Sequence, residues 1–222
     1  MTATFTAVPD SRQQGSEKRN KAMNGTDVYF SADVETDGPI PGKFSMLSFA
    51  LVLAGSFDGR RFKRSNLETC FYRELRPISD NFQPEALRVN GLDRNRLMLD
   101  GGDPVAVMTE AALWIKNVAQ SGAPILVAYP LSFDWSWLYW YFVNFLGSSP
   151  FNHSLCYDVK TAYAVKASVP ICESGKSRLL PSLRPQRSHT HHALEDAIEQ
   201  AEIFAKVFSW EGKLAGTTKT KT

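Results

Sequence analysis

The sequence is poor in cysteine and has little net charge, and each of these features excludes some classes of protein. Its three cysteines, Cys70, Cys156 and Cys172, have neither metal-binding nor redox spacing. We therefore expect reduced, mostly buried thiols, no cysteine-based zinc site and a cytoplasmic location. The formal net charge is only +2 over 222 residues. This balance excludes a strongly basic polyanion-binding protein, so any contact with nucleic acid needs a local basic patch.

Long apolar runs are also scarce, and only residues 125–147 could be considered as a membrane span. Pro130 and Asp134 fall near the middle of this window, where a bilayer tolerates them poorly. A strand, a short turn and a buried aromatic helix explain the segment better. We therefore expect no membrane partner.

The two ends of the chain lack periodic apolar patterns, which predicts disordered tails at residues 1–25 and 211–222 around one domain, residues 26–210. Strands are expected at VYFSADVE, SMLSFALVLAG, ETCFYREL, APILVAY and LCYDV. Helices are expected at QPEALRVNG, from Asp103 onward, from about Phe133 to Phe145, at KTAYAVKA and from about Ala193 to Ser209, with a loop over 168–190. Hairpin-linked strands followed by alternating helices and strands predict an α/β fold, a mixed β-sheet flanked by helices on both faces.

Acidic residues recur at the ends of the expected elements. Asp33 and Glu35 alternate along the end of the first strand, so their side chains share one face. Asp134 is the only charge in its apolar window and follows the fourth strand, where open α/β sheets place their sites; the alternative for Asp134 is a helix N-cap. Asp196 borders the apolar stripe of the final helix. Glu195, Glu199 and Glu202 are expected on that helix's solvated face.

These four acids could converge into one cluster. Neighbouring carboxylates repel each other unless a proton or a cation lies between them. Hard oxygen ligands without cysteine favour Mg²⁺ or Mn²⁺, and a pair of such ions is a known device for in-line attack at phosphate.

The segments "DVETDG", "SFDW" and "HHALEDA", in this order, resemble the motifs of the DEDDh exonucleases. That family includes ribonuclease T, oligoribonuclease and the proofreading epsilon subunit of bacterial replicative DNA polymerase. The resemblance covers about residues 28–208 and implies a ribonuclease-H-like fold. It also implies that Asp33, Glu35, Asp134 and Asp196 are the metal-binding catalytic acids.

The family spacing places a general base five residues before the last acid, which is His191 here. Helix geometry alone would instead favour His192, which is four residues from Asp196. His189 and His153 are expected to be surface residues. The His-Thr-His-His tract is also compatible with adventitious binding of a transition metal.

Two departures from the family pattern affect the expected substrate contacts. Asp37 stands where the family commonly has threonine, and it could repel a phosphate, pair with an arginine or have no role. Tyr129 could stack on a base or pack in the core. The residues expected to bind substrate are Thr36, Asp37, Gly38, Met46, Leu47, Tyr129, Lys176 and Arg178. Core packing is the alternative for Met46 and Leu47, and the basic residues from 160 to 187 either follow the phosphate backbone or only increase solubility.

The resemblance implies metal-dependent 3′→5′ hydrolysis of single-stranded nucleic acid, with RNA slightly favoured over DNA. Two Mg²⁺ or Mn²⁺ ions, a histidine base and nucleoside 5′-monophosphate products belong to this expectation. The expected partners are the 3′ ends of single-stranded RNA or DNA and, by analogy with small relatives such as ribonuclease T, a second copy in a homodimer. The alternatives are an inactive nucleic-acid-binding module of the same fold and a phosphoesterase acting on small nucleotides.

Overall fold

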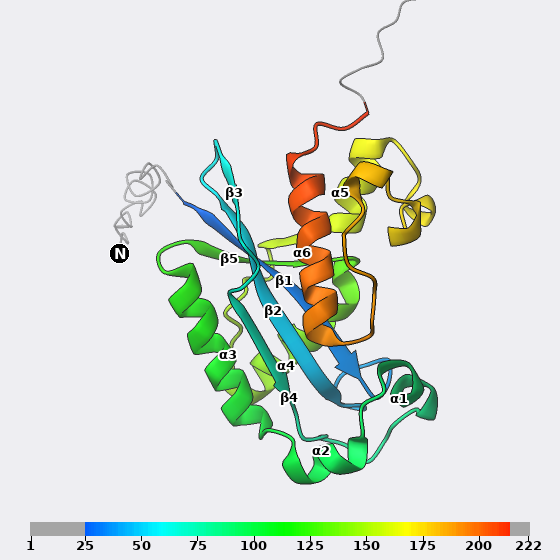
Figure 1. Cartoon of the computed structure of the whole chain (residues 1–222). Coiled ribbons are helices and arrows are strands. Elements are labelled where there is room, and N and C mark those ends of the chain that lie inside the picture. Colours follow the sequence, from blue (N-terminus) through cyan, green and yellow to red (C-terminus); the bar gives the residue numbers. More distant parts are fainter. Residues whose placement is uncertain (1–24, 214–222) are drawn as a thin grey trace, which may run out of the picture.

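A mixed β-sheet forms the centre of the molecule, whose computed structural model describes residues 25–213 (Figure 1). The sheet has six strands in the order β3-β2-β1-β5-β6, and β4 also pairs with β2. The strands are β1 (Asp27–Thr36), β2 (Met46–Phe57), β3 (Phe62–Arg64), β4 (Cys70–Glu74), β5 (Ala123–Ala128) and β6 (Cys156–Asp158). Strand β1 runs antiparallel to β2 and parallel to β5, so the predicted mixed sheet is confirmed.

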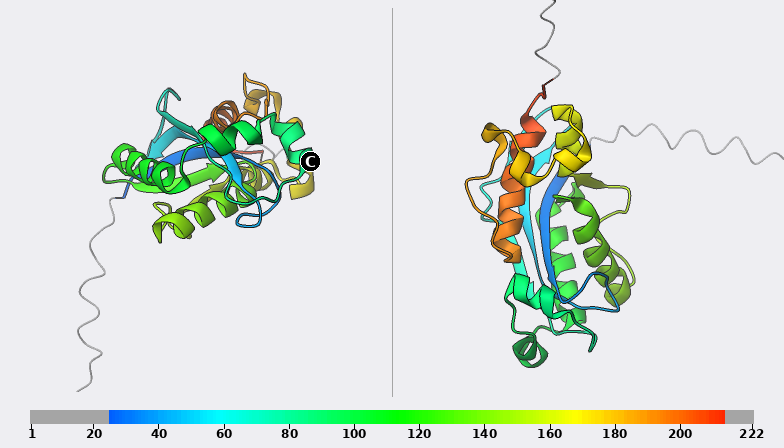
Figure 2. Two further views of the ribbon diagram at one scale, coloured as in Figure 1. Left: turned by 90° about the horizontal axis from the view of Figure 1, so that it is seen from below. Right: turned by 90° about the vertical axis from the view of Figure 1, so that its right-hand side faces the viewer.

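Helices cover both faces of this sheet. They are α1 (Pro84–Asn90), α2 (Arg94–Asp100), α3 (Pro104–Ala119), α4 (Leu131–Leu146), α5 (Val159–Ala167) and α6 (Ala193–Ser209). Figure 2 shows α6 on one side of the sheet and α3 and α4 on the other. The short helices α1 and α2 lie beyond the end of β1 (Figure 1). Within the described residues, no helix is both long enough and apolar enough to cross a membrane.

Strand β1 separates two apolar cores because its side chains alternate between the faces. Phe30 and Val34 pack in the core beneath α3 and α4, whereas Tyr29 packs in the core beneath α6. By the same alternation, Asp33 and Glu35 project on the side of α6. The apolar pattern of β1 therefore decides which helix meets its two acids.

The structure differs from the sequence-based expectation in several places. Helix α4 begins at Leu131, two residues before the predicted start, and α2 was not predicted. Short 3₁₀ turns interrupt the loop over 168–190. The prediction of mostly buried thiols is wrong, because all three cysteines are free and exposed. The predicted tails fall mainly on residues 1–24 and 214–222, outside the described part of the chain.

Candidate active site

Three of the predicted acids meet where the end of β1 faces the start of α6. Asp33 and Glu35 come from β1, and Asp196 lies fully buried in the first turn of α6. One carboxylate oxygen from each residue lies within 4.8 Å of the other two. Residues more than 160 positions apart in the sequence thus form one cluster of oxygen atoms.

Asp134 approaches the same cluster from the first turn of α4. Its side chain is 6% exposed, and its Oδ1 accepts a hydrogen bond of 3.1 Å from the backbone N–H of Val34. Pro130, and not Asp134, occupies the N-cap position of α4, although Asp134 does lie in the first turn, where the helix dipole favours an acid. The hydrogen bond ties α4 to β1 beside Asp33 and Glu35.

Burial and mutual repulsion make the ionised form of these acids unfavourable. Burial raises the pKa of Asp33 well above its usual range, and the charges of Asp134, Glu35 and Asp196 raise it further. Burial, with the charges of Asp196 and Asp134, raises the pKa of Glu35 to about 8. Burial also raises the pKa of Asp134 to about 7, although the N–H of Val34 opposes the shift. Such a set of hard, repelling oxygens fits divalent cations of the Mg²⁺ or Mn²⁺ kind.

A groove of about 550 Å³ opens over the acids. The acids that line it are Asp33, Glu35 and Asp134. Ala86 and Val89 of α1 form an apolar wall of the groove. Its other polar lining residues include Thr36, Lys176, His189 and His191. The groove is therefore both acidic at its base and partly apolar at its wall.

Gln200 connects the acids to the residue that follows β5, and the sequence did not reveal this role. Its Nε2 donates to Asp33 Oδ1 at 2.7 Å, and its Oε1 accepts from the backbone N–H of Tyr129 at 2.5 Å. Gln200 is 2% exposed and lies four residues after Asp196 on α6. That spacing on one helix face was the signal available in the sequence.

The structure separates the candidate histidines. His191 lines the groove and has a left-handed backbone with φ of 56°. His192 instead stacks on Tyr72, with ring centroids 4.9 Å apart, so the candidate from helix geometry lies away from the acids. His189 is exposed, as expected, but its Nδ1 also lies 3.1 Å from Asp196 Oδ2, a contact that the sequence did not predict.

Glu199 joins two residues of the groove beneath their exposed ends. It is 4% exposed, and its Oε2 lies 2.7 Å from Lys176 Nζ and 3.3 Å from His189 Nδ1. The prediction of a solvated position is therefore wrong for Glu199, and also for the buried Glu202. Glu195 alone of the three is on the exposed side of α6, where it pairs with Arg187.

Several predicted substrate contacts are corrected by burial. Met46 and Leu47 are fully buried, which supports core packing and removes them from the groove surface. Asp37 is also fully buried and pairs with Arg94, which is one of the alternatives considered. Arg178 lies outside the lining of the groove, 3.8 Å from Glu173.

Tyr129, Thr36 and Gly38 do line the groove, although each is largely engaged within the protein. The hydroxyl of Tyr129 donates to the carbonyl of Ser174. The hydroxyl of Thr36 donates to the carbonyl of Gly38 at 2.8 Å. A Cβ atom at Gly38 would lie 2.2 Å from the ring of Phe44, so only glycine fits this turn.

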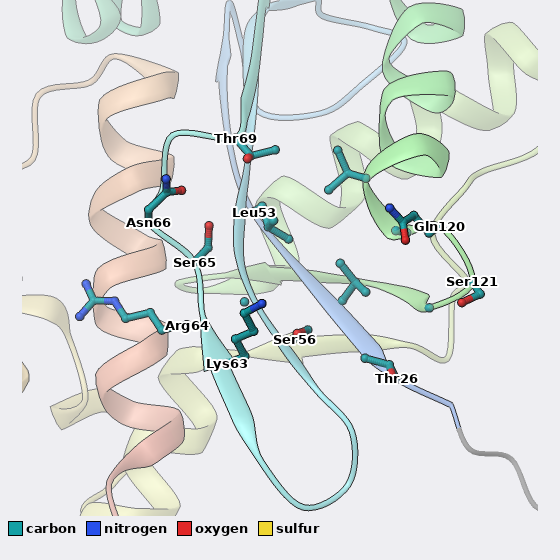
Figure 3. A pocket seen from close by; sticks show the side chains of 15 residues that line it. Thr26, Leu53, Ser56, Lys63, Arg64, Ser65, Asn66, Thr69, Gln120 and Ser121 are labelled. Carbon is teal, nitrogen blue, oxygen red and sulfur yellow. The ribbon is translucent and has the colours of Figure 1, made fainter.

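A second cavity, of about 570 Å³, lies at the opposite end of β1 (Figure 3). Thr26, Leu53, Lys63 and Gln120 are among its lining residues, and none of the lining residues is acidic. It therefore lacks the carboxylate ligands that the groove at the other end of β1 supplies.

Comparison with known proteins identifies the family of this chain. No family model matches the sequence. A 3′-5′ DNA exonuclease Cap18 from Escherichia coli is 36% identical over 179 residues, which span 80% of this chain and 90% of that protein.

Two solved structures show the same fold. The nuclease domain of 3′hExo, a DEDDh family member bound to rAMP, gives a TM-score of 0.62 at 14% identity, covering 85% of this chain and 94% of that one. Escherichia coli Exonuclease I in complex with a dT13 oligonucleotide gives 0.54 at 14% identity, covering 82% and 40%. The predicted ribonuclease-H-like α/β fold is thus confirmed, and with the sequence relationship to the DNA exonuclease these likenesses lead to one conclusion: the chain belongs to the DEDDh family of 3′-5′ exonucleases.

Proposed function

We propose that this exonuclease removes nucleotides from the 3′ end of single-stranded DNA with two Mg²⁺ or Mn²⁺ ions. The observation that carries the proposal is the meeting of Asp33, Glu35 and Asp196 within 4.8 Å. Two of these acids, Asp33 and Glu35, also line one groove together with Asp134. The relative at 36% identity is named a DNA exonuclease, which supports DNA over the slight RNA preference expected from the sequence.

The four acids are suited to hold the cations because their oxygens are hard, buried and mutually repelling. When bound, a pair of such ions supplies Lewis-acid stabilisation of the charge that develops on the attacking and leaving oxygens. Gln200 holds Asp33 in place through the 2.7 Å hydrogen bond from its amide. This orientation fixes one ligand before substrate arrives.

His191 acts as the general base that accepts the proton of the attacking water. It lines the groove next to the acids and comes from the loop directly before α6. An imidazole suits this role because its ordinary pKa lies near working pH. The left-handed backbone at His191 is a strained conformation for a residue with a side chain, and such strain clusters at functional sites.

The groove accepts an unpaired strand end with its terminal nucleotide against the apolar wall. Val89 of α1 and Phe133 of α4 line the groove and remain 55% and 41% exposed, so both offer surface to a base. Lys176 lies where it can contact a phosphate while Glu199 holds its Nζ. Contacts of Thr36, Gly38 and Tyr129 with the terminal nucleotide belong to the same proposal.

Digestion of matched single-stranded DNA and RNA, labelled at the 5′ end, tests this function with Mg²⁺ and with Mn²⁺. We expect a ladder of shortened DNA, release of nucleoside 5′-monophosphates and slower shortening of RNA. Asp33→Asn is the control and should abolish the ladder. Retention of DNA without cleavage would favour the binding-module alternative, and turnover of small nucleotide esters alone would favour the phosphoesterase. Sedimentation of the same preparation tests the predicted homodimer.

A further inference from the structure

His189, His191 and Asp196 form a second cluster of metal-ligand atoms beside the acids. One ligand atom from each residue lies within 4.8 Å of the other two. We propose that this cluster is an inhibitory site for borderline transition-metal ions such as Zn²⁺. It shares only Asp196 with the oxygen cluster of Asp33 and Glu35.

The distances within the cluster suit a tetrahedral ion. Zinc bonds to histidine and carboxylate are about 2.0–2.1 Å long, which places neighbouring ligand atoms about 3.3 Å apart. His189 Nδ1 and Asp196 Oδ2 are 3.1 Å apart. The rings of His189 and His191 lie nearly perpendicular, at 75°, with centroids 4.4 Å apart. Two imidazoles and one carboxylate oxygen can thus reach one ion, with a fourth position left for water.

The carboxylate of Asp196, which belongs to both clusters, provides a second indication that a cation belongs here. Its Oδ2 is a buried atom without a hydrogen-bond partner, because the 3.1 Å contact with His189 lacks hydrogen-bond geometry. A buried carboxylate oxygen is rarely left unpaired. Its other oxygen, Oδ1, accepts from the backbone N–H of Thr190 at 2.8 Å. That bond fixes the carboxylate so that the unpaired oxygen faces the histidines.

The ligand types separate the two sites chemically. Imidazole nitrogen favours Zn²⁺, Co²⁺ and Ni²⁺, whereas a set of carboxylate oxygens favours Mg²⁺ and Mn²⁺. Before an ion binds, Glu199 Oε2 lies 3.3 Å from His189 Nδ1 and competes for it. Glu199 also pairs with Lys176 at 2.7 Å, so Glu199 keeps a cationic partner when the ion takes the imidazole.

Occupation of this site would stop the reaction for two reasons. The nitrogen of His191 that binds the ion cannot accept a proton, and Asp196 is withdrawn from the activating cations. The inhibition, although not the binding, rests on the proposed roles of His191 and Asp196. Because Asp196 is shared, raising the Mg²⁺ concentration should weaken the inhibition.

Metal binding to the full chain tests the site without any assay of activity. Zn²⁺ is titrated against a chromophoric chelator, and Co²⁺ is followed by its visible absorption in the protein. We expect His189→Gln to weaken Zn²⁺ binding by at least roughly tenfold and to reduce the intensity of the Co²⁺ bands. His192→Gln is the matched control from the same tract, since His192 stacks on Tyr72, and should leave both unchanged. Equal Zn²⁺ affinity in the wild type and in His189→Gln would overturn the site.

Zn²⁺ titrated into the Mg²⁺-supported digestion tests the inhibition. We expect the Zn²⁺ concentration that halves the rate to rise with Mg²⁺. In His189→Gln, the Zn²⁺ concentration that halves the rate should rise by the same factor as the dissociation constant for Zn²⁺. Each rate is compared with the uninhibited rate of the same variant. Unchanged inhibition in a variant that no longer binds Zn²⁺ would overturn the regulatory role. If the chain shows no digestion with Mg²⁺, the proposed function fails, while the binding titration still decides the metal site.

Discussion

Arg94 Nε lies 3.0 Å from Oδ2 of Asp37, and the Asp37 side chain is fully buried. The backbone N–H of Ser45 donates to the other oxygen of Asp37 at 2.5 Å. Burial raises the pKa of Asp37, and the bonds from Ser45 and Arg94 oppose that shift. The carbonyl of Asp37 also accepts from the N–H of Gln83, the residue before α1. Asp37 therefore joins the end of β1 both to Arg94 of α2 and to the segment before α1, the helix that carries the groove's apolar wall.

Arg94→Met should destabilise the protein by about 3–5 kcal/mol, because it leaves the Asp37 carboxylate buried without its partner. The double variant Asp37→Asn with Arg94→Met should recover most of this loss, since no charge then remains buried. Urea unfolding of the three proteins measures the difference. Equal stability of the single and double variants would contradict the role of the pair. Loss of the pair in Arg94→Met should also displace the apolar wall formed by α1. In this variant we therefore expect KM for short oligonucleotides to rise by a larger factor than kcat falls.

The order of the elements and the positions of the acids were predictable from the sequence because both depend on local patterns. The alternation that makes residues 27–36 a strand also places Asp33 and Glu35 on one face. Helix α2 was missed although Asp93 caps it, since Leu97 is its only buried residue and no apolar stripe marks it. A short helix with one buried side chain has little periodic signal.

Burial of polar side chains was not predictable, because it depends on partners that lie far away in the sequence. Asp37 and Arg94 are 57 positions apart, and Gln200 reaches Asp33 across 167 positions. Glu199 has the sequence surroundings of a solvated helix residue, yet Lys176 from the preceding loop covers it. For such residues the charge pattern of one helix does not show which of its polar side chains another segment of the protein covers.

Gln200→Leu should reduce kcat and the affinity for Mn²⁺ by roughly 10–100-fold, because it removes the donor that orients Asp33. It also leaves the backbone N–H of Tyr129 without its acceptor. Gln200→Glu keeps the acceptor for Tyr129 but also lacks the amide donor, so it should show the same loss if the bond to Asp33 is the one that matters. Titration of Mn²⁺ against digestion rate measures both variants. If Gln200→Leu keeps the wild-type Mn²⁺ midpoint, Gln200 does not position Asp33.

His191→Asn should lower kcat by roughly 10²–10⁴-fold, the range expected when a general base is lost. Asparagine tolerates the left-handed backbone that His191 adopts, so the loop should keep its conformation. His192→Asn, which alters the next residue, should change kcat by less than about twofold, because a surface substitution away from the site has small effects. Rates at saturating DNA compare the two variants. A larger loss of kcat in His192→Asn than in His191→Asn would show that His192, and not His191, is the general base.

The metal-free protein should lose stability as pH rises, because its acids bind protons more tightly when folded. The pKa of Glu35 rises from an ordinary 4.5 to about 8, and that of Asp134 rises from 3.8 to about 7. At a pH between the ordinary pKa and the raised pKa of each acid, the folded state holds more protons than the unfolded state. The free energy of unfolding therefore falls with increasing pH. Thermal melting in EDTA should therefore give a higher Tm near pH 5, where the folded protein still holds these protons, than at about pH 8, where it is losing them.

Addition of Mn²⁺ near pH 8 should restore the Tm, since the cations bind the folded state and neutralise the repelling carboxylates. Glu35→Gln removes one of these charges and should flatten the pH dependence of the metal-free protein. Glu211→Gln replaces an exposed acid and serves as the control with an unchanged profile. A metal-free Tm that rises with pH would show that the carboxylates are stabilised by other groups when ionised. The groove could then not rely on cations to hold its negative charge.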